Sequence, residues 1–213
     1  SRGLGDVYKR QQKLQEHDIK VFVVHGNHDP LTSHDGSNKF ELPPNVFTFG
    51  CEVETQPVFR EGSEIAQVTG ISYQQAHVTE NLARSFKRKC DNDIYSIAVL
   101  HANIGAQPGH APYAPASVDD LKDSGFDYWA LGHVHRHTVL NESPYIVYPG
   151  NSQGRDIRET GERGCVQVDV NSDTGATKLE FIDTYVVHWE LLDLSIREHS
   201  QLGTSVSYTH LTL

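Results

Sequence analysis

The sequence has few of the features that mark several large classes of protein. Its three cysteines, Cys51, Cys90 and Cys165, are widely spaced and odd in number, which argues against a disulfide framework and favours a reducing compartment. No apolar run is long enough to cross a membrane, and the chain opens on no signal-peptide pattern. Internal repeats and low-complexity tracts are also lacking. We therefore expect a cytoplasmic globular protein.

Positive charge is scarce as well. The chain carries 18 Lys and Arg against 28 Asp and Glu, which gives a formal net charge of -10. Non-specific binding to nucleic acid depends on a broad positive field, so this composition excludes that mode of binding. A nucleic acid would have to be held locally or through bound metal. A hydrophobic content of 37% in 213 residues is ordinary for one globular domain.

The two ends of the sequence resemble translated sequencing adapter. Residues 1–11, SRGLGDVYKRQ, and residues 206–213, VSYTHLTL, can be back-translated into one adapter oligonucleotide read on opposite strands. Segments of this origin have to be set aside before the fold is considered. We expect the natural part to run from Gln12 to Ser205 and to be an internal piece of a longer gene.

Segments typical of strands and helices alternate along the natural part. Runs rich in β-branched and aromatic residues predict strands, whereas capping residues and four-residue apolar spacing predict helices. Ser117 and Asp120 form a capping-box pattern at the start of one helix, with Gly125 as its stop. This alternation predicts a layered α/β domain. The expected strands are 19–24, 45–50, 66–73, 95–101, 126–132, 145–151, 165–170 and 177–190; the expected helices end near residue 18 or span 79–89 and 117–125.

Three of the predicted strands end in histidine with glycine close by. The stretches VFVVHGNHD, SIAVLHANIG and YWALGHVHRH bring Asn27 and His28, His101, and the pair His133 and His135 to strand ends. In α/β folds, ligands bind beyond the carboxyl ends of strands, and glycine lets backbone approach them closely. Imidazole and amide oxygen are common metal ligands. On an extended backbone His133 and His135 would project to one side. The sequence therefore predicts a metal site.

Each stretch has a simpler explanation when it is taken alone. GNHD could be a polar turn, GHVH could be an exposed strand with surface histidines, and His101 could be a hydrogen-bonded histidine at a strand end. Three such signals at three strand ends favour the metal site over these alternatives. The other histidines outside such settings are expected to be mostly solvated or structural: His17, His34, His77, His110, His137, His188 and His199.

The motifs GNHD, LHANIG and GHVHRH resemble the third, fourth and fifth motifs of the calcineurin-like metallophosphoesterases. Within this superfamily, the sequence is similar to the bacterial DNA-repair exonuclease branch, the SbcD-like and YhaO-like proteins. The similarity is carried by four segments: IKVFVVHGNHDP, GHAPYAPASVDDL, DYWALGHVH and YPGNSQGR. This resemblance implies a layered sandwich of two mixed β-sheets flanked by helices. It implies a metallophosphoesterase domain at 12–187, followed at 188–205 by the start of a segment leading to a capping domain.

The resemblance also implies roles for individual residues. Asn27, His101 and His133 would bind one divalent metal and His135 another, the pair usually being manganese, with iron or zinc as alternatives. His28 would stabilise the transition state or protonate the leaving oxygen, and Asp29 would orient the His28 imidazole. Two such ions bind phosphate oxygens and lower the pKa of a bound water.

Two family motifs, Asp-x-His and Gly-Asp-x-x-Asp, should precede Gln12 and are not found there. Gly5-Asp6 resembles the start of the second motif but lies in the suspected adapter and lacks the second aspartate. We expect the polypeptide as written to be truncated at the N-terminus, to bind metal weakly and to be inactive, whereas its parent is an active hydrolase.

The expected function is a metal-dependent phosphodiester hydrolase, the nuclease subunit of a DNA-repair exonuclease. DNA would be its substrate and a coiled-coil SMC-like ATPase its partner; formation of a homodimer stays open, and no membrane is involved. Three alternatives remain: an enzyme acting on a phosphoprotein, cyclic nucleotide or nucleotide-lipid, a scaffold subunit for the ATPase, and a mononuclear zinc module, which does not explain Asn27.

Overall fold

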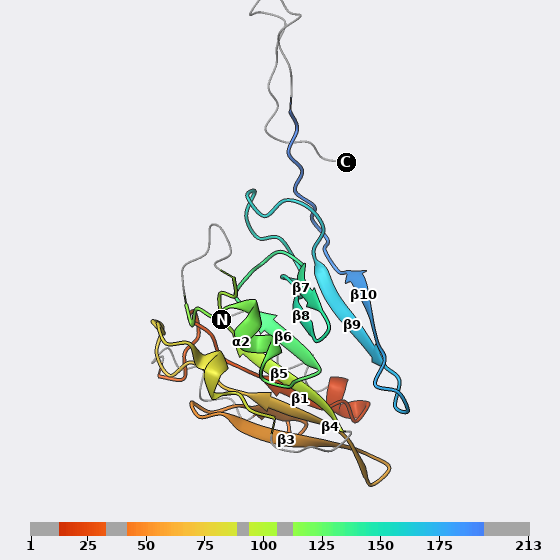
Figure 1. Ribbon diagram of the computed structural model, residues 1–213. Coiled ribbons are helices and arrows are strands. Elements are labelled where there is room, and N and C mark those ends of the chain that lie inside the picture. The colour runs from red at the N-terminus through yellow and green to blue at the C-terminus, as the bar shows by residue number, and fades with distance from the viewer. Residues whose placement is uncertain (1–12, 33–41, 89–93, 106–112, 194–213) are drawn as a thin grey trace, which may run out of the picture.

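A mixed six-stranded sheet forms the centre of the protein (Figure 1). The computed structural model describes residues 13–32, 42–88, 94–105 and 113–193. Neighbouring strands follow the order β3-β4-β5-β6-β8-β7, and the inner strands run parallel while β3 and β7 pair antiparallel at the two edges. The strands are β3 (Glu54–Arg60), β4 (Ser63–Gly70), β5 (Tyr95–His101), β6 (Tyr128–Gly132), β7 (Thr138–Glu142) and β8 (Tyr145–Tyr148).

Two smaller sheets accompany the central one. Strand β1 (Val21–Val23) pairs in parallel with β2 (Val46–Thr48), and β9 (Gly164–Val170) forms an antiparallel hairpin with β10 (Thr177–Asp183). A backbone hydrogen bond joins the segment that follows β1 to the segment that follows β4. In it, the amide of Tyr73 donates to the carbonyl of His25 at 3.0 Å. The end of β1 is thereby held beside the central sheet. The predicted α/β class with a mixed sheet is confirmed.

Helices are few and short in the described part. Helix α2 (Val118–Lys122) begins as predicted, with Ser117 accepting from the Asp120 amide and Asp120 completing the capping box. The helix predicted at 79–89 is wrong: a single 3-10 turn, η2 (Leu82–Ser85), forms instead. Its N-cap residue Asn81 makes no capping bond with its side chain, and Phe86 is already extended. Within the described ranges no helix is long and apolar enough to span a membrane.

The core packs one face of β5 and β6 against aromatic side chains. Trp129 is fully buried beside Phe86 and Phe126, with ring centroids 5.0 and 5.5 Å away. The Tyr148 hydroxyl donates to the carbonyl of Ala102 at 2.7 Å and accepts from the amide of Ile104 at 2.8 Å. Buried polar groups are costly unless they are paired, so these bonds hold the backbone just beyond His101 in place.

Candidate metal centre

The carboxyl ends of β1, β5 and β6 bring three of the predicted ligands together. Strands β5 and β6 are parallel neighbours in which His101 lies opposite Gly132, so His133 follows directly beside His101. The two imidazole centroids are 5.2 Å apart. From the loop after β1, Asn27 Oδ1 lies 2.8 Å from His101 Nε2. Residues far apart in the sequence thus meet at one point, as the strand-end pattern predicted.

The glycines beside these residues leave room for the His101 ring. A Cβ atom on Gly26 would lie 2.5 Å from the His101 imidazole, and one on Gly132 would lie 2.9 Å from its Nδ1. Real Cβ atoms do not come so close to a neighbour, so the ring fits only because both positions carry no side chain. The glycines in GNHD and GHVH are therefore required by the packing of His101.

Asp29 closes the loop that carries Asn27. Its carboxylate accepts from the Gly26 amide at 2.9 Å and lies 3.1 Å from Nδ1 of His25. The His25 amide in turn donates to Ser72 Oγ at 2.9 Å. These contacts give Asp29 a part in shaping the loop. The role predicted for it towards His28, whose side chain is exposed, stays a prediction.

Burial and neighbouring charge keep His101 neutral. Burial is the main cause that lowers the pKa of His101 to about 4, and His133 lowers it further, while Asp29 opposes the shift. His28 and His135 also depress this pKa, by smaller amounts. A neutral imidazole keeps a lone pair on one ring nitrogen, as metal binding requires.

The backbone turns sharply after β6, and this separates the two histidines of GHVH. Strand β6 ends at Gly132, and the next residue, His133, has φ 101°. Residues other than glycine seldom adopt a φ in this region. The backbone at His133 is therefore not extended, contrary to the expectation. His133 packs edge-to-face on Tyr113 at 5.6 Å, whereas His135 bonds through Nδ1 to Glu159 Oε1 at 2.6 Å.

The donor set suits a divalent transition metal. Two ligands on neighbouring positions of one ion, each about 2.1 Å from it, lie roughly 3 Å apart. The 2.8 Å separation of Asn27 Oδ1 and His101 Nε2 is compatible with both reaching the same ion. Among the residues that the structure places, no three His, Cys, Asp or Glu side chains gather closely enough to count as a metal cluster. In the predicted set, the amide oxygen of Asn27 is the donor that accompanies His101 and His133.

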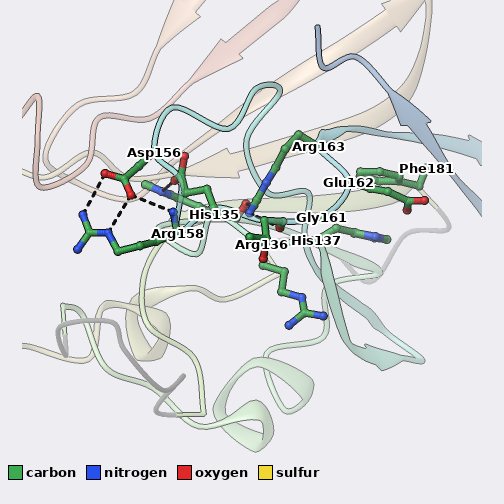
Figure 2. Close-up of a pocket in the computed structure, with 11 residues that line it drawn as sticks. His135, Arg136, His137, Asp156, Arg158, Gly161, Glu162, Arg163 and Phe181 are labelled. Carbon is green, nitrogen blue, oxygen red and sulfur yellow. Dashed lines mark hydrogen bonds and ion pairs between the residues drawn. The ribbon is translucent and has the colours of Figure 1, made fainter. Parts of the chain in front are cut away.

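A cavity of about 850 Å³ opens beside His135 (Figure 2). Its wall includes Arg163, which is buried and donates to the carbonyls of His135 and Thr160. On another side His137 stacks on Phe181 with ring centroids 4.5 Å apart. The exposed Arg158 pairs with Asp156, 2.8 Å from Nε to Oδ1, as the dashed lines show.

Sequence reasoning missed the residues that support His135. Burial raises the pKa of Glu159, but hydrogen bonds from the Arg155 amide, His135 and Asn151 outweigh it, and the pKa is lowered overall. Glu159 and Asn151 lie in a loop after β8, away from any histidine motif. The sequence feature that could have pointed to Glu159 is the presence of an acidic residue in the glycine-rich stretch that follows YPGN.

Comparison with protein families gives a match over most of the chain. The sequence model of the calcineurin-like phosphoesterases matches residues 2–137. The chain is 40% identical to the uncharacterized metallophosphoesterase YhaO of Bacillus subtilis strain 168, over 89% of this chain and 46% of that protein.

Two archaeal proteins are more distant relatives. The DNA double-strand break repair protein Mre11 of Methanococcus maripaludis is 24% identical over 91% of this chain and 54% of its own length. Mre11 of Methanocaldococcus jannaschii is 23% identical over 92% of this chain and 54% of its own. The chain spans about half the length of the curated relatives it matches.

Proposed function

Because the chain belongs to the calcineurin-like phosphoesterase family, we propose that it is the catalytic part of a metal-dependent nuclease that hydrolyses phosphodiester bonds in DNA. The observation that carries this proposal is the convergence of Asn27, His101 and His133 at the ends of β1, β5 and β6. Members of the family are phosphoester hydrolases that hold divalent metals. The choice of DNA as substrate goes further than family membership does.

The residues divide into those that hold metal and those that handle the phosphate. Asn27, His101 and His133 would hold one ion and His135 a second, manganese being the expected metal and iron or zinc the alternatives. When bound, the ions would supply Lewis-acid charge and an activated water. His28, exposed beside Asn27, donates a proton or a hydrogen bond to the leaving oxygen. The cavity beside His135 has room for substrate groups next to the phosphate.

The relatives support DNA as the substrate. The names of the archaeal proteins assign them to the repair of DNA double-strand breaks. With a net charge of -10, the chain cannot hold DNA through a general positive surface, so bound cations would provide the attraction. Within this proposal the partner is a coiled-coil ATPase, residues 188–205 lead towards a capping domain, and a homodimer remains an alternative assembly.

The proposal is tested by nuclease assays on the 213-residue chain and on the product of the complete gene. With Mn²⁺ and a linear DNA duplex, we expect hydrolysis by the full-length protein and little or none by the chain alone. His28→Ala should lower kcat far more than it changes metal affinity, because His28 acts on the phosphate. Turnover of a phosphoprotein, cyclic nucleotide or nucleotide-lipid with no turnover of DNA would favour the alternative phosphoesterase. Undiminished nuclease activity in Asn27→Ala would contradict the assigned site.

A further inference from the structure

Glu159 makes a short side-chain contact with His135. Its Oε1 lies 2.6 Å from Nδ1 of His135, a distance typical of a strong, charge-assisted hydrogen bond. The Glu159 side chain is only 17% exposed, although the His135 side chain is 55% exposed. A mostly buried carboxylate therefore reaches outward to a histidine that faces solvent.

Other groups hold the Glu159 carboxylate in place. Asn151 Nδ2 donates to Oε1 at 3.1 Å, and the Arg155 amide donates to Oε2 at 2.7 Å. Both oxygens are thus engaged by the loop 151–163 itself. A carboxylate fixed from two sides can impose an orientation on a third group, whereas a freely rotating surface carboxylate cannot.

The same loop also holds the backbone of His135. The Asn151 amide donates to the carbonyl of His135 at 3.1 Å, and the buried guanidinium of Arg163 donates to that carbonyl as well. A Cβ on Gly150 would come within 2.9 Å of this oxygen, so the two segments are in close contact. The ring and the main chain of His135 are both restrained by residues 150–163.

We infer that Glu159 is a positioning residue that holds His135 in one tautomer and one ring orientation for metal binding. By accepting the Nδ1 hydrogen it places the lone pair on Nε2, the nitrogen that would bind the cation. Histidine ligands commonly donate their second ring nitrogen to a carboxylate in this way, and loss of that partner costs about 10- to 100-fold in metal affinity. This inference rests on the proposed function, in which His135 is a ligand.

The chain contains a matched control. His188 and Glu190 also form a histidine–carboxylate pair, 3.2 Å apart, but Glu190 is 73% exposed and lies outside the candidate site. Glu190→Gln removes a carboxylate from a histidine just as Glu159→Gln does. Any effect specific to the site should therefore appear in Glu159→Gln and be missing in Glu190→Gln.

The test combines nitrogen-15 NMR of the histidine rings in the 213-residue chain with Mn²⁺ titration of the product of the complete gene, because the chain alone is expected to bind metal weakly. In the unsubstituted chain without metal, at a pH where His135 is neutral, we expect the Nδ1-protonated tautomer, with His135→Ala identifying the signal. Glu159→Gln should give a mixture of tautomers and bind Mn²⁺ about tenfold or more weakly. Glu190→Gln should match the unsubstituted protein in both measurements. Thermal unfolding checks that each variant is folded.

A double variant separates positioning from general support. In the His135→Ala background, Glu159→Gln should cause no further loss of Mn²⁺ affinity, since the ring it orients is gone. The inference is overturned if Glu159→Gln leaves the tautomer unchanged, or if it weakens metal binding equally with and without His135. Failure of the proposed function would look different: His135→Ala alone would bind Mn²⁺ as the unsubstituted protein does, and the tautomer measurement would still decide the role of Glu159.

Discussion

His101 and His135 are both predicted metal ligands, yet the fold supports them in different ways. His101 is fixed by the ends of three strands and lies between Gly26 and Gly132, which have no side chains. His135 lies two residues beyond His133 on a half-exposed segment and is held by a loop that follows β8. The first position depends on packing, which tolerates little change, and the second depends on a few hydrogen bonds. The two sides should therefore respond differently to pH and substitution.

The largest expected effect is the acid sensitivity of the His101 side. Burial lowers the pKa of His101 to about 4, below the ordinary value of about 6.5, so the unfolded chain takes up this proton at higher pH than the folded one. The free energy of unfolding should fall as pH drops from about 6.5 towards 4, by about 3 kcal/mol in all. Urea unfolding without metal across this range measures the fall.

The His101→Gln variant provides the control for this pH profile. Because it lacks the titrating ring, its free energy of unfolding should change less between pH 6.5 and 4 than that of the unsubstituted chain. Parallel profiles for the two chains would show that the acid sensitivity comes from other groups.

Gly26→Ala should be the next most damaging change. The new methyl group would lie 2.5 Å from the His101 ring, and overpacking of this kind typically costs about 1–3 kcal/mol. We expect a lower free energy of unfolding and weaker Mn²⁺ binding together, measured by urea unfolding and titration. Gly50→Ala is the matched control, since its methyl group would meet only the end of the Glu54 side chain, at 3.2 Å. Equal losses of unfolding free energy and Mn²⁺ affinity in the two variants would show that the surroundings of His101 are no more sensitive to an added methyl group than those of Gly50.

The smallest effect should come from an ion pair on the loop side. Hydrogen bonds from Arg158 lower the pKa of Asp156 to about 2, but both side chains are exposed to solvent. Exposed pairs of this kind add little to stability. We expect Asp156→Asn to leave the Tm unchanged at neutral pH and at any salt concentration, as measured by thermal unfolding. A drop in Tm as large as that of Gly26→Ala would mean that the loop is as tightly packed as the strand ends.

The contrast also explains which parts of the site could be predicted from sequence. Asn27, His101 and His133 follow strands whose apolar pattern is plain, and neighbouring parallel strands end at the same edge. Glu159 is 24 residues from His135, and no periodic pattern links the two. A contact between a loop and a strand end depends on the path of that loop, and its sequence does not reveal this path.

The same distinction applies to the fold. The inner strands β4, β5, β6 and β8 were expected from their apolar runs, but β3 was not, because Pro57 and its charged residues do not resemble a strand. Proline is tolerated there because β3 is an edge strand with a neighbour on one side only. The helix expected at 79–89 does not form, because Phe86 adopts an extended conformation as it enters the aromatic core around Trp129.

The narrow space around the His101 ring has an evolutionary consequence. Since a Cβ atom on either Gly26 or Gly132 would meet the same imidazole, three positions far apart in the sequence share a single volume. A mutation that adds a side chain at either glycine would be tolerated only in a background where the ring had already been lost. The histidine cannot be exchanged for a bulkier residue while both neighbours stay close. We therefore expect drift at these three sites to be coupled, so that a lineage that keeps the imidazole also keeps both glycines.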